Sequence, residues 1–338
     1  MVQNEVLIYA QLPDGKVVPG TTLKKETSEF DVDSVELNGG FVLKAKAISL
    51  DPYLKGRMRK PEAKSYNQPL EPGKPLETLG VGEVVRSDSP DIEVGSIWRG
   101  LVDAANYSVV SGVSLKKGKV ITNEEDLPWT NLVGSVGMPS ATAWVGLYQI
   151  GKIQKGETIF ISAASGAVGQ IACQLAKRDG LKVIGSAGSD EKVEFLKSIG
   201  VDVAFNYKTE DTQKVLSEHP FDVYFENVGG ETLDAVLATI NQKGRIIACG
   251  AVSQYSLPKG QQYHIQNTSA VVTKSLRWEG FIVFNHDLSE FEKTMPKLIK
   301  SGEVKIREHV VNGLDNGEAL ADLLDGTAHG KVVYSIEA

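Results

Sequence analysis

The first third of the chain carries short apolar runs separated by polar segments that contain Gly and Pro. These runs lie at residues 5–10, 41–50, 79–87 and 95–110. Many short runs with turns between them, and little helical periodicity, predict a compact, mostly β, barrel-like domain. A helical stretch is expected next, over residues 127–150.

From Gly156 onward the pattern changes to strands that alternate with helices. Buried strands are expected at residues 157–163, 182–188, 201–207, 221–230 and 245–251, and a sixth at 276–284 after the long loop 252–275. The helix after the first strand carries Val168, Ile171 and Leu175 on one stripe, which is typical of an amphipathic helix. This alternation predicts an α/β fold with a doubly wound parallel sheet.

The last part of the chain predicts a return to the first domain. After Asp287 an amphipathic helix is expected, then a strand at 309–313, a short helix around 320–324 and a strand at 331–338. A final strand after a complete sheet suggests that the tail pairs elsewhere. We therefore expect a β domain of residues 1–127 and 297–338, and a nucleotide-binding domain of residues 128–296.

The turn after the first strand of the sheet has the composition of a dinucleotide-binding turn. It follows the pattern A-x-x-G-x-x-G, with Ala163 where the commoner pattern has Gly. A side chain at Gly166 would keep the backbone away from a pyrophosphate, and Gly169 lets the helix pack close to the strand. The N–H groups and the dipole at the helix start favour an anion. Small residues also occur in ordinary βα turns, so the motif alone leaves that alternative open.

The end of the second strand favours NADPH over NADH. An NAD site needs a carboxylate there for the ribose 2′-hydroxyl, but residues 185–189 contain none. Asp190 and Glu191 follow, in positions typical of the first turn of a helix. Lys192 and Tyr207 suit a 2′-phosphate instead. The alternative is that Lys192 is a solvated helix residue, as most lysines are.

The composition indicates a globular protein that does not bind nucleic acid. The 338 residues suggest two domains, and the net charge of −7 offers no basic surface. The two cysteines, Cys173 and Cys249, lie in apolar surroundings, which fits a reducing compartment. No signal peptide and no membrane-length apolar stretch are recognisable, so we expect a cytoplasmic protein without membrane contact.

Six segments together carry a resemblance to a known family. They are ISLDPYLKGRM, LVGSVGMPSATAWVGL, ASGAVGQ, GSAGSDEKVEFLKSIGVDVAFNYKT, FENVGGETLDAVL and GRIIACGAVSQY. The chain resembles the medium-chain dehydrogenase/reductase superfamily, and more closely its zinc-independent NADPH-dependent double-bond reductases. That branch includes prostaglandin reductases (the leukotriene B4 dehydrogenase type) and alkenal reductases. The resemblance implies a GroES-like β-barrel domain, a Rossmann domain, and reduction of the C=C bond in α,β-unsaturated aldehydes and ketones.

Matched by motif, the resemblance assigns the NADPH contacts to three groups of residues. The pyrophosphate would be lined by Ala163, Gly166, Ala167, Val168 and Gly169. The adenosine end with its 2′-phosphate would be held by Gly188, Ser189, Lys192 and Tyr207. The nicotinamide end would be bordered by Asn227, Cys249, Gly250 and Tyr255.

Two tyrosines are the expected catalytic residues. Hydride transfer to the β-carbon of a small hydrophobic enal or enone builds negative charge on the carbonyl oxygen, and that enolate needs a hydrogen-bond donor. Tyr255, after the fifth strand, is the expected donor, and Tyr53 is expected to face the substrate cleft. The alternatives are that Tyr255 is a loop tyrosine with a satisfied hydroxyl and that Tyr53 only packs.

No metal site is expected. Zinc-dependent members of the superfamily use Cys, His and a third ligand, but Asp51 stands where the first ligand would fall. Neither cysteine lies in the β domain, and the five histidines lack ligand-like spacing. Similar enzymes often carry G-D-N-x-G-K near the C-terminus; here Ala328 replaces the Asn, with His329 as the alternative contact.

Two other functions stay open at this stage. One is a zinc-independent NADPH quinone oxidoreductase, which only a comparison of substrates would separate. The other is a non-catalytic NADPH-binding regulatory module. The resemblance also implies a homodimer, formed through the sixth strand, which is expected to begin at Leu276 and to end at Phe284.

Overall fold

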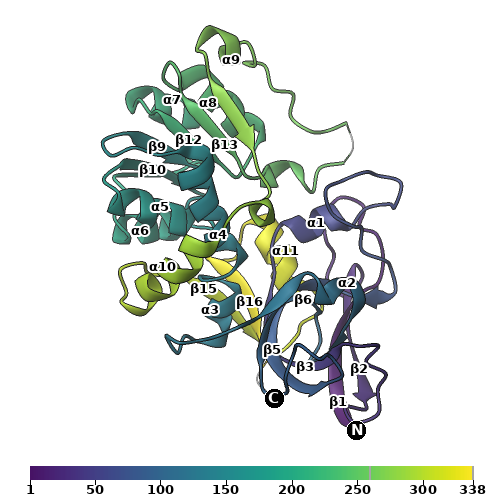
Figure 1. Ribbon diagram of the computed structural model, residues 1–338. Coiled ribbons are helices and arrows are strands. Elements are labelled where there is room, and N and C mark those ends of the chain that lie inside the picture. Colours follow the sequence, from purple (N-terminus) through teal and green to yellow (C-terminus); the bar gives the residue numbers. More distant parts are fainter. Residues whose placement is uncertain (259, 337–338) are drawn as a thin grey trace. The chain divides into compact units, whose positions relative to one another are not determined.

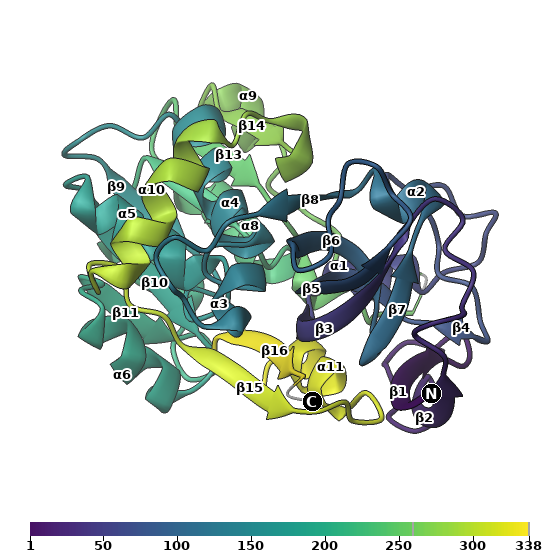
Figure 2. The same ribbon diagram turned by 60° about the horizontal axis from the view of Figure 1, so that its bottom comes forward.

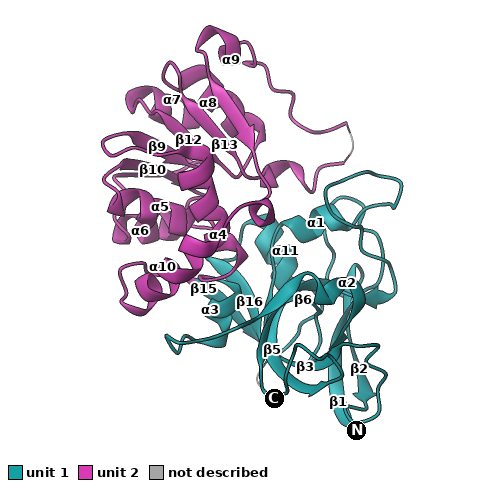
Figure 3. Ribbon diagram, viewed as in Figure 1, with its two compact units in different colours: residues 1–134, 308–338 teal, residues 135–307 magenta. Residues whose placement is uncertain are grey.

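The computed structural model describes residues 1–258 and 260–336, which form two compact units (Figure 3). Unit 1 comprises residues 1–134 and 308–338, and unit 2 comprises residues 135–307. These bounds differ from the expected ones at both crossings. Helix α3 (Trp129–Val133) packs on the sheet of unit 1, and α10 (Ser289–Lys300) packs against α4 (Met138–Trp144) of unit 2.

Unit 2 is built on a six-stranded parallel sheet. Its strands are β9 (Thr158–Ile161), β10 (Lys182–Ala187), β11 (Val203–Asn206), β12 (Val223–Glu226), β13 (Arg245–Ala248) and β14 (Arg277–Gly280). The spatial order β11-β10-β9-β12-β13-β14 confirms the expected doubly wound sheet. Figure 1 shows β9, β10, β12 and β13 of this sheet beside helices of unit 2. The centre is aromatic: Phe160 on β9 stacks on Tyr224 of β12, with ring centroids 5.1 Å apart.

The connecting helices of unit 2 follow the strands in turn. Besides α4 and α10 they are α5 (Gly169–Arg178), α6 (Asp190–Ser198), α7 (Thr212–Glu218), α8 (Gly230–Thr239) and α9 (Ala270–Thr273), with the π-helical turn η1 (Val145–Gly151) and the 3₁₀ turns η2 (Val252–Gln254) and η3 (Val283–Asn285). The helical stretch expected at 127–150 is therefore divided among α3, α4 and η1. The loop expected at 252–275 contains η2 and α9, and its residue 259 lies outside the described residues.

Helix α5 is buried well beyond the predicted stripe. Ile171, Ala172 and Leu175 are buried, but so are Gln170 and Gln174. The Gln170 amide makes two hydrogen bonds with the main chain of Arg307, at 3.0 and 2.7 Å. The Gln174 amide makes two with the main chain of Lys305, at 2.7 and 2.8 Å, and a third to the Gln170 carbonyl at 3.0 Å. Because these bonds satisfy the buried amides, the polar positions of the helix can face protein instead of water.

Unit 1 consists of two sheets and four short helices. The strands are β1 (Val2–Tyr9), β2 (Leu23–Phe30), β3 (Phe41–Ser49), β4 (Lys74–Pro75), β5 (Glu77–Ser87), β6 (Ile97–Asp103), β7 (Tyr107–Val110), β8 (Gly118–Ile121), β15 (Glu308–Asn312) and β16 (Lys331–Ser335). The helices are α1 (Tyr53–Arg57), α2 (Gly112–Leu115), α3 and α11 (Glu318–Asp325). The larger sheet has the order β15-β16-β3-β5-β6-β8, with β7 paired to β3, so the chain's tail joins the N-terminal strands (Figure 2).

Some expected elements differ in length from the observed ones. The sixth strand was expected to reach Phe284, but β14 ends at Gly280 and the 3₁₀ turn η3 follows. The final strand was expected over 331–338, whereas β16 ends at Ser335, and residues 337–338 lie outside the described residues. Among the residues that the structure describes, no helix combines the length and apolar character needed to cross a membrane.

Candidate dinucleotide-binding site

The carboxyl ends of β9 and β12 meet where the strand order of the sheet reverses. Strands β10 and β11 lie on one side of β9, and β12, β13 and β14 lie on the other. Open α/β sheets bind ligands outside the strand ends at such a point. Ser162 links the two turns there: the Asn227 N–H donates to Ser162 Oγ (3.0 Å), and Asn227 Nδ2 donates to the Ser162 carbonyl (2.8 Å).

The turn between β9 and α5 is a closely packed backbone. Ala163 has a left-handed conformation, with φ of +47°, which explains why the commoner pattern has Gly at this position. A Cβ on Gly169 would lie 2.4 Å from the Ala163 carbonyl oxygen, and one on Gly166 would lie 3.1 Å from that atom. No side chain caps the N-terminus of α5. With Ala167 and Val168 half-buried, the turn presents main chain, which fits a pyrophosphate.

The ends of β10 and β11 bring together the residues expected at the adenosine end. A Cβ on Gly188 would lie 3.1 Å from the Tyr207 hydroxyl, so these residues are neighbours. Ser189 caps α6, with its Oγ accepting the Lys192 N–H at 3.4 Å. The Asp190 carboxylate accepts a hydrogen bond from Asn206 Nδ2 (2.8 Å), so it is bound to the end of β11.

Lys192 belongs to a cluster of cations. Its side chain is buried, with 8% of the residue exposed, which contradicts the alternative of a solvated helix lysine. Burial lowers the pKa of Lys192, and the nearby charges of Lys208 and Arg307 lower it further. Arg307 also pairs with Glu191 on α6. Three like charges around one point attract an anion with more than one charge, such as a 2′-phosphate.

The residues expected at the nicotinamide end form a second group, beyond β12 and β13. The N–H groups of Cys249 and Gly250 both donate to the Glu226 carbonyl at 3.0 Å. The Tyr255 hydroxyl accepts the Ala251 N–H at 3.0 Å, and it would lie 3.0 Å from a Cβ on Gly250. A hydroxyl that accepts this bond is compatible with donation of its hydrogen to a developing oxyanion. Burial, followed by the charge of Glu226, raises the pKa of the Cys249 thiol to about 12, so the thiol is a poor nucleophile.

The second expected catalytic tyrosine, Tyr53, belongs to unit 1. It begins α1, and its hydroxyl lies 3.4 Å from Thr78 Oγ1, which in turn donates to the Ser49 carbonyl. Burial and then the charge of Asp51 raise the pKa of the Tyr53 hydroxyl above its usual value. Tyr53 is thus a neutral hydrogen-bonding group at neutral pH, and its catalytic role stays a prediction.

Asp51 stands at the position expected for a first metal ligand, and its carboxylate forms an ion pair with Lys331. Lys331 Nζ lies 2.8 Å from Asp51 Oδ1 and donates to the Leu50 carbonyl at 2.6 Å. Ser49 Oγ donates to the other carboxylate oxygen. In the part of the chain that the structure describes, no three His, Cys, Asp or Glu side chains are grouped as metal ligands would be. Nearby in the sequence, Ala328 packs in the apolar core of unit 1, and His329 is half-buried.

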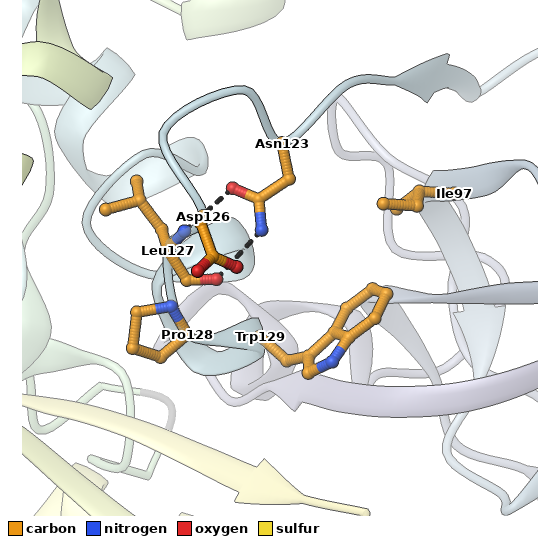
Figure 4. A pocket seen from close by; sticks show the side chains of 6 residues that line it. All are labelled: Ile97, Asn123, Asp126, Leu127, Pro128 and Trp129. Atoms are coloured by element: carbon orange, nitrogen blue, oxygen red, sulfur yellow. Dashed lines mark hydrogen bonds between the residues drawn. The ribbon is translucent and has the colours of Figure 1, made fainter.

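Unit 1 also contains an open hollow of about 540 Å³ beside the segment that leads to α3 (Figure 4). Asn123 stabilises its wall, accepting the Leu127 N–H at 3.0 Å and donating to the Leu127 carbonyl at 2.9 Å. Trp129 and Ile97 line the other side. None of the expected site residues lines this hollow.

Comparisons with known proteins agree with this geometry. Residues 13–117 match a family described as the N-terminal domain of oxidoreductase, and residues 167–300 match one described as zinc-binding dehydrogenase. The chain is 40% identical to an NADP-dependent oxidoreductase of Cochliobolus heterostrophus over 346 residues, covering 99% of this chain and 98% of the relative. It is also 40% identical to a 2-alkenal reductase (NADP(+)-dependent) of Nicotiana tabacum, covering 99% and 96%.

The solved structures include a similar protein with its cofactor. The crystal structure of CurA in complex with NADPH from Vibrio vulnificus matches with a TM-score of 0.86 and 32% identity, over 99% of both chains. Fold and site therefore define a dehydrogenase or reductase with a Rossmann unit and a GroES-like unit. The chain belongs to the medium-chain dehydrogenase/reductase superfamily, in its zinc-independent branch, as the resemblance implied.

Three residues of this region were not expected from the sequence. Lys208 directly follows the expected Tyr207, so a cation there had a local signal. Arg307 had none, because it lies 116 residues from its partner Glu191 along the chain. Glu226 was interpreted only as part of a strand, although its side chain binds the turn that follows.

Proposed function

We propose that this protein catalyses the NADPH-dependent reduction of the C=C bond in α,β-unsaturated aldehydes and ketones. The cation cluster of Lys192, Lys208 and Arg307 beside Tyr207 is the observation that favours NADPH over NADH. The similarity to the 2-alkenal reductase of Nicotiana tabacum, over 99% of this chain, supports the substrate class. Together they support an oxidoreductase that acts on small enals and enones.

The residues present fit NADPH along its whole length. The turn from Ala163 to Gly169 would hold the pyrophosphate, and the cation cluster would hold the 2′-phosphate. Asn227, Cys249 and Gly250 would border the nicotinamide, which supplies a hydride to the β-carbon when NADPH is bound. All these cofactor contacts would come from unit 2.

The chain's own residues stabilise the charge that develops on the substrate. Tyr255 donates its hydroxyl hydrogen toward the carbonyl oxygen while accepting the Ala251 N–H. Tyr53 of unit 1 also has a neutral hydroxyl, and its expected place facing the substrate cleft stays a prediction. Protonation of the α-carbon by water or by a tyrosine completes the reduction.

The test is cofactor consumption by the purified chain with a medium-chain 2-alkenal, with NADPH and NADH compared and the product identified. We expect the saturated aldehyde, formed faster with NADPH. An allylic alcohol as the product would contradict C=C reduction. Turnover confined to quinones would identify a quinone oxidoreductase, and NADPH binding without any turnover would identify a regulatory module.

We also propose a homodimer formed through the edge strand β14. Its residues are all exposed, and it pairs with β13 on one side only. Trp278 is 40% exposed and Phe284 is 61% exposed beside this edge, which is unusual for large apolar side chains. Analytical ultracentrifugation should give the dimer mass, and Trp278→Lys should shift it to that of the monomer. A wild-type monomer would contradict the proposal.

A cytoplasmic location stays a prediction, which cell fractionation tests.

A further inference from the structure

The turn after β12 is held by the side chain of Glu226, the last residue of that strand. The side chain is buried, with 3% of the residue exposed. Its Oε1 accepts three hydrogen bonds, from the N–H groups of Val228 and Gly229 at 2.7 Å and from the Tyr224 hydroxyl at 2.9 Å. Oε2, the other carboxylate oxygen, has no hydrogen bond to any residue that the structure describes.

The main chain of Glu226 holds the neighbouring segment as well. Its carbonyl accepts the N–H groups of Cys249 and Gly250, at 3.0 Å each. The two segments also join directly, because the Val252 N–H donates to the Asn227 carbonyl at 3.1 Å. A Cβ on Gly229 would lie 2.7 Å from Ala251 Cβ, so the contact is close. Residues 227–230 and 249–253 therefore form one block, which we call the nicotinamide block, and Glu226 is bonded to both of its halves.

The carboxyl of Glu226 titrates near neutrality. Burial raises its pKa to about 7, against the hydrogen bonds from Gly229, Val228 and Tyr224, which lower it. Tyr224 on the same strand and Cys249 after β13 are the titratable groups beside it, and burial raises the pKa of both. Strand β9 contributes the uncharged Ser162, which is bonded to the Tyr224 hydroxyl. Only Glu226 in this cluster changes its charge near pH 7.

The two charge states of Glu226 hold the block with different strength. Hydrogen bonds to an ionised carboxylate are about twice as strong as those to a neutral group. A proton would bind at Oε2, which leaves the three bonds to Oε1 in place but makes them neutral. Protonation therefore loosens the nicotinamide block without breaking its connections.

We propose that Glu226 is a positioning residue for the nicotinamide end of the cofactor, and that NADPH binds more weakly once this carboxylate is protonated. The inference rests on the proposed NADPH-dependent function. Glu226 acts through Asn227, Cys249 and Gly250, which it holds in place. The adenosine end lies after β10 and β11, and no hydrogen bond links its residues to Glu226 in the described part of the chain.

The experiment compares two ligands that share the adenosine end. NADPH and 2′-phospho-ADP-ribose, which lacks only the nicotinamide, are titrated by fluorescence or calorimetry from about pH 5 to pH 9, with the wild type and Glu226→Gln. Both ligands carry the same 2′-phosphate and the same pyrophosphate diester, so their own titration cancels and the ratio of their affinities isolates the nicotinamide end. We expect this ratio to fall roughly three- to tenfold in the wild type as the pH drops through about 7. Glu226→Gln should give the lower ratio at every pH.

Controls separate positioning from a structural role. Tyr224→Phe keeps the carboxylate and both main-chain bonds, so the pH dependence of the ratio should remain. A buried carboxyl with a raised pKa makes the folded state less stable as pH rises through the window from about 4.5 to about 7. At pH 8, where Glu226 of the wild type is ionised at this cost, Glu226→Gln should therefore melt at no lower temperature than the wild type.

The outcomes distinguish this inference from the proposed function. A ratio that does not change with pH in the wild type, or an unchanged ratio in Glu226→Gln, would overturn the role of Glu226 alone. So would a loss of melting temperature in Glu226→Gln that accounts for its weaker binding. Failure of the wild type to bind either ligand would overturn the NADPH-dependent function and this inference together.

Discussion

Ala163 stands where the commoner dinucleotide-binding pattern has a glycine. Its φ of +47° is a left-handed conformation, which is unfavourable for a residue with a Cβ. Ala163→Gly should raise the free energy of unfolding by about 0.5–1 kcal/mol, after the entropy of the added glycine is subtracted. Ala164→Gly is the matched control: Ala164 is buried and has no left-handed φ, so its change should destabilise. Thermal unfolding measures both, and an unstable Ala163→Gly would contradict the argument.

Arg307 should contribute to the choice between NADPH and NADH. It neutralises Glu191 beside Lys192, so its loss leaves a negative charge near the 2′-phosphate. Arg307→Ala should weaken NADPH binding roughly three- to tenfold and leave NADH binding nearly unchanged. Lys197→Ala is the control, because Lys197 pairs with Glu194 on the exposed face of α6, the helix that also carries Glu191. Equal losses of affinity for NADPH and NADH would show that Arg307 does not contribute to recognition of the 2′-phosphate.

Tyr255 is expected to act on the substrate and not on the cofactor. Tyr255→Phe removes the hydroxyl that would stabilise the enolate, so turnover should fall at least about tenfold while NADPH affinity stays near normal. Tyr263→Phe provides a matched change in the same loop, where the hydroxyl donates to Asp234 at 3.0 Å. Unchanged turnover in Tyr255→Phe would remove Tyr255 from the mechanism.

Residues were predictable where their signal was local. Gly166 and Gly169 stand in the turn between β9 and α5. Lys192 stands in the first turn of α6, and Tyr207 directly follows β11. Arg307 reaches the same cluster through the main-chain bonds of Gln170, which no sequence pattern encodes. Glu226 resembled an ordinary strand residue, since its burial and its three donors exist only in the fold.

At the level of elements, helix α8 depends on a lysine from outside the helix. Lys274 Nζ donates to the carbonyls of Leu237, Ala238 and Ile240, at 3.1, 2.7 and 3.0 Å. These carbonyls end the helix and have no intrahelical donor. Lys274 therefore replaces the usual capping of a helix C-terminus.

Lys274→Met should lower the free energy of unfolding by about 1–3 kcal/mol, because it leaves carbonyls without a charged donor. Lys300→Met is the control, since Lys300 is an exposed residue in the last turn of α10 and should cost about 0.5 kcal/mol or less. Urea denaturation compares the two. Similar losses would show that Lys274 acts only through its charge.

Elements were predictable where one face is apolar and buried. Strands β9, β10, β12 and β13 are largely buried and were expected. Strand β2 was missed because its sequence LKKETSEF is mostly polar and exposed, and it is held by pairing with β1. Helix α7 was missed for a similar reason, since Leu216 is its only buried residue.

At the level of the whole molecule, a buried ion pair in unit 1 joins two segments that are far apart in sequence. Asp51 and Lys331 side chains are each 4% exposed. Lys331→Met leaves the Asp51 charge buried without its partner, which should cost about 3–5 kcal/mol. The double variant Asp51→Asn with Lys331→Met should recover most of that loss. Melting temperatures decide, and equal losses in the single and double variants would contradict a charge effect.

The return of the tail was predictable, but its partners were not. A strand left over after a complete sheet indicated a second domain built from both ends of the chain. That β16 pairs with β3 on one side and β15 on the other depends on contacts between residues far apart in sequence. The observed bounds of the units differ from the predicted ones for the same reason. Helix α3 packs on β3, β5 and β16, which are far from it in sequence.

The place of β16 inside its sheet has a consequence for synthesis on the ribosome. Asp51 emerges 280 residues before Lys331, and β3 emerges long before the strand that covers its edge. Unit 2 is contiguous and complete once Arg307 has been translated. Until residues 308–338 have left the ribosome, the β unit therefore lacks β15 and β16, and the edge of β3 stays open. A translation stop between these points would release a molecule that is half folded and prone to aggregate.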